Sequence, residues 1–477
     1  MRKLVIHSIR LLLIAISSLT LVVIALVLTA KHFDQHSLQP APDKGSIVLD
    51  NVNIVPISRS GIIYKQKIVI RHGVITAVES AGPPYPSGLE VKDFKGAFLT
   101  PGLIDMHVHI DDREQLRLAL SYGVTAVRNM DGMPMHTRWI KELNKGDWMG
   151  ATLYSTSPSI HGENHSSPYD IRVEDPEHAS RLVRRFVEDG WDQIKVYSGL
   201  GLEEFKRLIE DSDAAGIGIV GHVPYSAVNS NYSLSGRMKS IEHVEEIFQG
   251  PLNFEFDVDK LDDISKALAT TGSVVCPTLS TFEYLTRISD EKEGYVDQLS
   301  TKFMTPFGAY IDFQFNVSRW LSASPERAAY NKREFEFLGE IVNSLDQHNV
   351  QMIAGTDAGT NFVETGSSMV HELILMRDAG LSPQRVLETA TINAAKVLGK
   401  SNTLGTVELG KIADFILVSQ NPLRFLETMA DPVAVVKGGN VISSSGIVSL
   451  RSGDSEVAGW WVSAARYIEG ISVRLFY

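Results

Sequence analysis

Hydrophobic and polar residues alternate in short segments near both ends of the chain. Such alternation is typical of half-buried β-strands. The segments are separated by turns that contain glycine, and they are residues 46–55, 67–70, 73–78, 406–418 and 432–441. Because both groups have this pattern and bracket a long middle part, we expect one small β-sandwich domain built from residues 46–96 and 401–450 together.

The middle of the chain, residues 97–400, alternates short apolar runs with longer amphipathic stretches. Eight runs resemble buried strands, namely residues 97–103, 125–130, 152–155, 193–197, 218–222, 240–243, 273–276 and 351–357. The stretches 176–189 and 202–214 show helical periodicity. Repeated strand–helix units indicate a parallel sheet, and eight of them suit a closed (β/α)8 TIM-like barrel of the α/β class. A doubly wound open sheet is the alternative, but no Gly-x-Gly-x-x-Gly turn follows the first strand.

The first 32 residues are expected to form a membrane anchor. Residues 11–30 are an apolar run long enough to span a bilayer, and basic residues precede it. A positive flank stays in the cytoplasm, so the remaining chain is expected to be exported to the periplasm or the cell exterior. A cleaved signal peptide and a secreted protein are the alternative. Residues 33–45 are expected to be a linker.

Composition limits the partners and the chemistry. The net charge is -12 and the pI is near 5.6, whereas nucleic-acid binding requires a basic surface. The single cysteine, Cys276, excludes an intramolecular disulfide and a zinc site built from several cysteines. Residues 281–333 interrupt the strand–helix alternation and are expected to form either a lid or additional helices. The tail, residues 451–477, is expected to pack on its own domain.

Polar residues stand where the predicted barrel strands end. His107 and His109 are spaced i, i+2, so on a strand they point to the same face. The other strand-end residues are Lys195, His222, His243 and Asp357. Each of them alone is more often structural than functional. However, the carboxyl ends of barrel strands converge on one mouth, and imidazole and carboxylate groups that meet there suit zinc or a similar divalent ion.

Several longer motifs surround these residues. They are Pro-Gly-Leu-Ile-Asp-Met-His-Val-His (101–109), Ser-Ile-Glu-His (240–243), Gly-Thr-Asp-Ala-Gly (355–359), Ala-Thr-Ile-Asn-Ala-Ala-Lys (390–396) and Gly-Lys-Ile-Ala-Asp-Phe (410–415). Together they resemble the metal-dependent amidohydrolase superfamily, and more narrowly its imidazolonepropionase-related and prolidase-like branch. The resemblance covers residues 46–446 and implies a barrel hydrolase with a divalent-metal centre.

This resemblance implies six metal ligands, His107, His109, Lys195, His222, His243 and Asp357. His107, His109 and Asp357 would hold the more buried zinc ion, and His222 and His243 would hold a second. Lys195 would carry a carbamate derived from carbon dioxide and bridge both ions. If Lys195 is not carboxylated, a site with one ion is expected. Asp357 is also the implied catalytic base, which takes a proton from the attacking water and passes it to the leaving nitrogen.

Five further residues are expected to line the mouth and bind substrate: Arg128, His161, His165, Tyr197 and Tyr225. Prolidase-like relatives commonly have His-Ala-Tyr at the fifth strand, with the tyrosine helping to hold the substrate. This chain has His222-Val-Pro-Tyr225, so the tyrosine is displaced by one residue. Pro224 redirects the chain after the strand, which still allows Tyr225 to reach the site.

The sequence therefore favours a hydrolase that cleaves an amide C–N bond in a small peptide-like or N-acyl substrate, with a dipeptidase as the most concrete reading. A cyclic-amide hydrolase of the imidazolone type and a deaminase are the alternatives among enzymes. A non-catalytic, anchored metal-binding protein is the alternative of another class. The expected partners are a small-molecule or short-peptide substrate and the membrane but not nucleic acid, and a homo-oligomer is left open.

Overall fold

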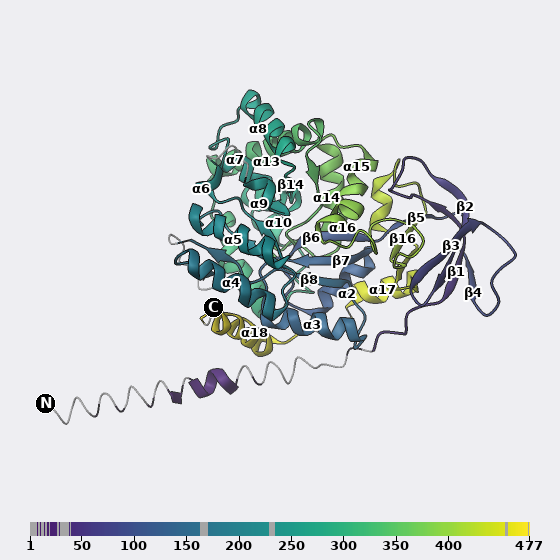
Figure 1. Ribbon diagram of the computed structural model, residues 1–477, viewed down its shortest axis with the longest axis horizontal. Coiled ribbons are helices and arrows are strands. Elements are labelled where there is room, and N and C mark those ends of the chain that lie inside the picture. The colour runs from purple at the N-terminus through teal and green to yellow at the C-terminus, as the bar shows by residue number, and fades with distance from the viewer. Residues whose placement is uncertain are drawn as a thin grey trace.

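The computed structural model describes residues 40–162, 170–228, 234–453, 457–475 and 477, together with Leu38 and scattered earlier positions. A large barrel surrounded by helices makes up most of the molecule, and a smaller β domain lies beside one end of it (Figure 1). The predicted site residues that the structure describes all belong to the barrel and its loops. His165, another predicted site residue, lies outside the described residues.

Eight parallel strands form the barrel. They are β6 (Leu103–Val108), β7 (Val124–Asn129), β8 (Thr152–Ser155), β11 (Gln193–Val196), β12 (Gly218–Gly221), β13 (Ser240–Glu242), β14 (Val274–Cys276) and β15 (Gln351–Met352). Two ladders run β6-β7-β8 and β11-β12-β13-β14-β15. The parallel bridges Thr156↔Gln193 and Val108↔Ala358 join the ladders into a ring. The closed barrel is therefore confirmed, and the open doubly wound sheet is excluded.

The prediction of the first strand was wrong in its bounds. The run 97–103 is divided between two sheets, because β5 (Phe98–Pro101) joins the β domain and β6 begins the barrel. Gly102 lies between them, where an added Cβ would stand 2.2 Å from the Thr125 hydroxyl oxygen. Only a residue without a side chain lets the chain pass so close to β7 as it leaves one sheet and enters the other.

Helices cover the outside of the barrel. They are α2 (Arg113–Ser121), α3 (Pro134–Lys145), α4 (Pro176–Asp189), α5 (Leu202–Ala215), α6 (Tyr225–Val228), α7 (Glu245–Gln249), α8 (Val258–Thr271), α14 (Ser367–Asp378), α15 (Pro383–Glu388) and α16 (Ala394–Val397). The helix predicted over 176–189 shows the local causes clearly. Asp175 caps its N-terminus, proline occupies its first turn, and the left-handed Gly190 ends it. Its buried face includes Leu182 and Phe186, which pack in the main core.

Both ends of the chain contribute to the β domain. Its strands are β1 (Ile47–Ile54), β2 (Ile63–Arg71), β3 (Val74–Ser80), β4 (Glu90–Asp93), β5, β16 (Phe415–Val418), β17 (Ala434–Lys437) and β18 (Asn440–Ser443). They form one sheet in the order β18-β17-β16-β5-β1-β2-β3, with β4 paired to β1. Both chain ends thus build one small β domain, as expected, and its strands form one continuous sheet because β5 pairs with both β1 and β16.

The stretch 281–333 forms helices. It includes most of α9 (Leu279–Glu291), then α10 (Glu293–Val296), α11 (Pro306–Asp312), a π-helical turn (Phe313–Val317) and α12 (Ser318–Leu321), and it runs into α13 (Pro325–Gln347). A separate hydrophobic cluster that includes Ile288, Val317 and Phe362 packs these helices together. The additional helices are therefore confirmed, and a lid role for them stays a prediction.

The tail packs on the barrel, as expected. Helix α17 (Ser444–Ser452) leads into it, and its own helix is α18 (Trp460–Arg474). Arg466 of α18 is buried and donates hydrogen bonds to the Asp111 carbonyl at 2.8 Å and the Asp112 carboxylate at 3.0 Å. Arg474 pairs with Asp131 at 2.6 Å. These contacts fix α18 against the loops that follow β6 and β7, on the side of the barrel where those strands end.

Residues 1–32, the predicted anchor, lie largely outside the described part of the chain. Within the described part, no helix combines the length and the apolar character needed to cross a bilayer. The anchor and the exported location therefore stay predictions.

We expect the substitution Arg466→Leu to destabilise the protein by roughly 3 kcal/mol, because it leaves the buried Asp112 carboxylate without its cationic partner. Chemical denaturation followed by circular dichroism measures the change. Arg237→Leu is the matched control, since Arg237 forms an exposed ion pair with Asp213, and such pairs contribute only about 0 to 1 kcal/mol. Equal midpoints for the two variants would contradict this account of α18 docking.

Candidate active site

Three predicted ligands meet where β6 and β15 adjoin. His107 lies on β6, His109 follows that strand, and Asp357 follows β15. The Asp357 amide donates to the His107 carbonyl at 2.8 Å, which holds the two chain segments in register. Asp357 Oδ1 lies 3.4 Å from His107 Nε2 and 3.1 Å from His109 Nε2. The three side chains can offer one atom each within 4.8 Å of one another, which is a spacing that can hold one metal ion.

The other two predicted histidines lie beside this group. His243 follows β13, and its ring centroid is 4.6 Å from that of His107. His222 follows β12, and its ring centroid is 5.1 Å from that of His243. The neighbouring strands β12 and β13 thus bring His222 and His243 together. His243 also lies beside His107 of β6, which is not a neighbour of β13, because the carboxyl ends of all barrel strands converge on one mouth.

Three of the four candidate histidines have a partner on their Nδ1 atom. His107 Nδ1 contacts Glu242 Oε2 at 2.9 Å, and His222 Nδ1 contacts Glu246 Oε1 at 2.7 Å. His243 Nδ1 contacts the Thr278 hydroxyl at 2.7 Å. A donated Nδ1 proton fixes the tautomer that leaves Nε2 available to a metal. Within the described residues, Nε2 of the buried His107 and of His222 has no hydrogen-bond partner, so the donor set fits a bound cation.

Lys195 lies on β11 with its side chain buried beside this cluster. Its Nζ atom has no hydrogen-bond partner among the described residues. Desolvation lowers the pKa of Lys195, with the carboxylates of Glu242 and Asp357 opposing the shift. A buried, unpartnered amine that is more easily neutral than usual fits the predicted carbamate, because carbon dioxide reacts with the neutral amine and the carbamate would bring its own negative charge to the cations.

The electrostatics suit cation binding. Desolvation lowers the pKa of His107 well below its ordinary value, with the Lys195 charge acting in the same direction, and lowers the pKa of His243 to about 3. Both imidazoles are therefore neutral at neutral pH, which is the form that binds a metal. Burial by itself would raise the pKa of Asp357. The hydrogen bond with His109 and the electrostatic attraction of the neighbouring histidines lower this pKa by more than burial raises it. The pKa of Asp357 thus lies well below its ordinary range, and the carboxylate is ionised.

Backbone strain marks the same strand ends. His243, Thr278 and Asp357 have φ angles of 67°, 54° and 59°, in the left-handed region that residues with a side chain seldom adopt. Gly355 shows how tight the ring is here, because an added Cβ would lie 2.6 Å from the Cys276 sulfur and 2.8 Å from His107. Such strain is tolerated where the surrounding contacts fix the backbone. Here the strained residues are the candidate ligands His243 and Asp357, together with Thr278, which contacts His243.

Arg128 does not lie at the mouth as expected. It is 1% exposed and donates to Glu242 at 2.6 Å, to the Met106 carbonyl at 2.7 Å and to the Ser240 hydroxyl at 2.9 Å. Its side chain points into the barrel interior and pairs there with Glu242. A buried carboxylate without a cationic partner would be strongly destabilising, and Arg128 supplies that partner. Arg128 therefore holds Glu242, which in turn holds His107, and this placement does not support a contact with substrate.

Three other predicted substrate residues, His161, Tyr197 and Tyr225, are described by the structure and lie on the His222 side of the histidine cluster. Tyr197 is placed between His161 and His222, with both ring centroids 4.3 Å from its own. Tyr225 is 46% exposed at the start of α6. These three candidates surround the His222 side of the site, and their role in substrate binding stays a prediction.

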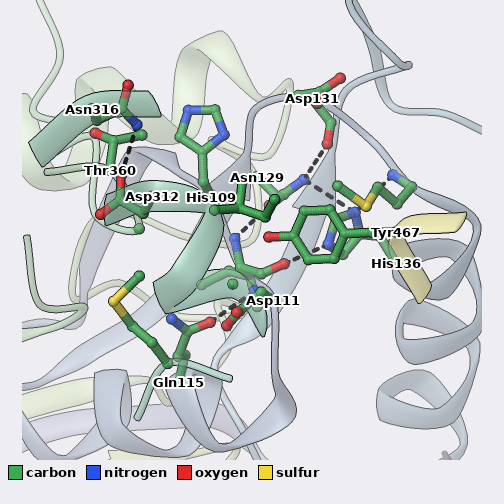
Figure 2. A pocket seen from close by; sticks show the side chains of 16 residues that line it. His109, Asp111, Gln115, Asn129, Asp131, His136, Asp312, Asn316, Thr360 and Tyr467 are labelled. Carbon is green, nitrogen blue, oxygen red and sulfur yellow. Dashed lines mark hydrogen bonds between the residues drawn. The ribbon is translucent and has the colours of Figure 1, made fainter. Parts of the chain in front are cut away.

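A pocket of about 220 Å³ opens beside His109. Its walls come from the loops after β6 and β7, from α11 and the π-helical turn, and from Tyr467 of α18 (Figure 2). The polar lining residues are His109, Asp111, Gln115, Asn129, Asp131, His136, Asp312, Asn316, Thr360 and Tyr467. Sequence reasoning missed all of them except His109 as site residues. The one available signal was position, because Asn129 ends β7 just as Val108, which stands between His107 and His109, ends β6.

Replacing Glu246 with alanine is expected to weaken metal binding about 10- to 100-fold, because His222 loses the partner that orients its ring. Competition with a chelator, followed by metal analysis of the protein, measures the affinity. Glu245→Ala is the matched control, since Glu245 is the neighbouring carboxylate but lines a separate small cavity with Phe282 and Glu334. If both variants bind metal like the unchanged protein, Glu246 does not support the ligand His222.

Comparison with known proteins agrees with this geometry. Residues 98–442 match the amidohydrolase family. Imidazolonepropionase from Pseudomonas syringae pv. tomato is 24% identical over 362 residues, which cover 68% of this chain and 80% of that protein. Imidazolonepropionase from Idiomarina loihiensis is 25% identical over 404 residues, covering 78% and 90%.

Solved structures show the same fold. A bottromycin amidohydrolase superposes with a TM-score of 0.69 and 24% identity, covering 88% of this chain and 90% of that one. A Xaa-Pro dipeptidase with bound methionine in its active site superposes with a TM-score of 0.65 and 17% identity, covering 84% and 100%. With the family match spanning the barrel and part of the β domain, the resemblance seen in the sequence motifs is confirmed. The chain belongs to the amidohydrolase family.

Proposed function

We propose that this amidohydrolase cleaves the amide C–N bond of a small peptide-like or N-acyl substrate, in the manner of a dipeptidase, with one or two divalent ions. The observation that carries the proposal is the convergence of His107, His109 and Asp357 beside a pocket of about 220 Å³. A pocket of that size suits a substrate of a few residues at most, since drug-sized ligands occupy about 300 to 1,000 Å³.

The donor set indicates which residues would hold the ions. His107, His109 and Asp357 form one group, and His222 and His243 lie beside it. Lys195, as a carbamate, would be shared between them. A divalent cation bound there supplies Lewis-acid chemistry, because it lowers the pKa of water and polarises a carbonyl group. Zinc is the ion that we propose, since imidazole and carboxylate ligands suit it.

Asp357 is the proposed proton carrier. Its carboxylate is ionised, so it can accept a proton from an attacking water molecule and then donate that proton to the leaving nitrogen. The Thr360 hydroxyl donates to Asp357 Oδ2 at 3.0 Å and the Asp357 amide is bound to the His107 carbonyl, so the carboxylate is held in one orientation. A fixed base avoids the cost of ordering it during the reaction.

Cyclic-amide hydrolysis is the second candidate. The curated relatives reported above are imidazolonepropionases, and their 24% and 25% identity to this chain supports this second candidate. Both candidate reactions add water to an amide carbonyl carbon, and both need a group that carries a proton from the water to the leaving nitrogen. The difference lies in the substrate that fits the pocket.

A substrate panel tests the proposal directly. We expect the zinc-loaded, full-length protein to hydrolyse dipeptides or N-acyl amino acids faster than cyclic amides, and to contain about two zinc ions per chain when bicarbonate is present during metal loading. Liquid chromatography of the products and metal analysis provide the two readings. Faster turnover of the imidazolone-type ring would favour the second candidate, and a metal-loaded protein that cleaves no member of the panel would favour a binding protein.

The substitution Asp357→Asn is expected to lower kcat about 100- to 10,000-fold, because the amide cannot carry the proton. Metal content should fall much less, since His107 and His109 still offer their nitrogen atoms. Steady-state kinetics and metal analysis of the same preparation separate the two effects. Near-normal turnover in this variant would show that Asp357 is not the base.

A further inference from the structure

The pocket beside His109 has an acidic lining. Three carboxylates face it, from Asp111, Asp131 and Asp312, and the described lining residues include neither lysine nor arginine. Figure 2 shows Asp312 and Asn316 on one side of the pocket and Tyr467 on another. An acidic lining alone does not define a binding site, because carboxylates are often occupied by structural contacts. The partners of each carboxylate therefore decide whether a ligand is needed.

Two of the three carboxylates are occupied. Asp131 pairs with Arg474 at 2.6 Å and accepts from the Ser159 amide and hydroxyl. Asp312 accepts hydrogen bonds from the amides of Asn361 and Phe362, so it holds the turn that follows Asp357. Both carboxylates have structural roles, and neither offers a reason for a bound ligand.

Asp111 differs from them. Its Oδ2 atom accepts from the Thr305 hydroxyl at 2.6 Å and from the Thr305 amide at 3.1 Å. Its Oδ1 atom has no hydrogen-bond partner in the described chain, although the residue is only 8% exposed. Arg466 contacts the Asp111 carbonyl and the Asp112 carboxylate and leaves Oδ1 without a donor. A buried carboxylate oxygen without a partner is costly, so a donor from outside the chain would stabilise it.

Helices α11 and α18 form the pocket walls near Asp111. Gly308 of α11 lies so near that an added Cβ would stand 1.9 Å from Asp111 Oδ2. Tyr467 of α18 contributes an aromatic wall to the same pocket. Helix α18 lies beyond residues 98–442, the part of the chain that matches the family. The pocket is therefore completed by an element outside the shared barrel.

From this arrangement we infer that Asp111 is the anchor of an ammonium subsite, which selects substrates that carry a protonated primary amine, such as a dipeptide with a free N-terminus. The inference deepens the proposed function and rests on it for the reaction. The ammonium group would donate to Asp111 Oδ1, and the ring of Tyr467 offers an aromatic surface that also favours a cation. This subsite explains why α11 and α18 enclose a carboxylate so close to the ligand His109.

The substitution Asp111→Asn tests the subsite with little risk to folding, because the amide oxygen can still accept both hydrogen bonds from Thr305. The first reading is calorimetric binding of n-pentylammonium and of n-pentanol to the full-length, zinc-loaded protein at pH 8. We expect the unchanged protein to bind the cation at least about tenfold more tightly than the alcohol, and Asp111→Asn to abolish that preference. Asp290→Asn, an exposed carboxylate on α9, is the matched control and should retain it.

The second reading is kcat/KM for alanyl-alanine and for its N-acetyl derivative. Asp111→Asn should lower kcat/KM about 10- to 100-fold for the free dipeptide, mainly through KM, and change it little for the acetylated one. Equal binding of the cation and the alcohol by the unchanged protein, or a preference that survives in Asp111→Asn, would overturn the subsite. Cation binding that depends on Asp111 without hydrolysis of either compound would support the subsite and count against the proposed reaction.

Discussion

Closure of the barrel between β6 and β15 is the constraint on which the candidate site depends. The Asp357 amide bonds to the His107 carbonyl at 2.8 Å, and the Thr356 amide and hydroxyl bond to Asp105. These contacts bring the last strand of the ring onto the first, and Gly355 removes the side chain that would keep them apart. An open sheet would leave Asp357 at one edge and His107 at the other, so the ligand cluster exists only because the ring closes.

The interior of this ring contains a buried ion pair. Arg128 and Glu242 are both buried and lie 2.6 Å apart, and Glu242 also contacts His107 Nδ1 at 2.9 Å. Removal of either would leave a desolvated charge, which is far more costly than loss of an exposed ion pair. The pair therefore ties the position of a ligand histidine to the stability of the barrel. In contrast, Lys195 has no hydrogen-bond partner in the described residues, which is consistent with a site that is complete only with its cations.

The candidate metal ligands and much of the pocket wall come from different parts of the chain. The ligand histidines and Asp357 lie at barrel strand ends, within the region that matches the family. The pocket walls come from α11, in the long insertion between β14 and β15, and from α18 at the C-terminus. A shared barrel can thus keep one reaction while added helices change which substrates reach it.

Local patterns in the sequence determined the strands, the helices and the strand-end ligands. The spacing of His107 and His109 and the motifs around His243 and Asp357 depend on residues adjacent in the chain, so they can be read directly. The division of the run 97–103 between two sheets could not be read, because pairing partners distant in sequence decide where each half goes.

The partners of the polar side chains were decided only by the tertiary structure. Arg128 occupies a strand-end position like the ligands, yet its long side chain turns inward to Glu242, more than 100 residues away along the chain. Asp111 and Tyr467 are separated by most of the chain and meet only because α18 packs on the loops after β6 and β7. Sequence patterns report which face of its own element a residue occupies, whereas burial and pairing of charge depend on the whole packed molecule.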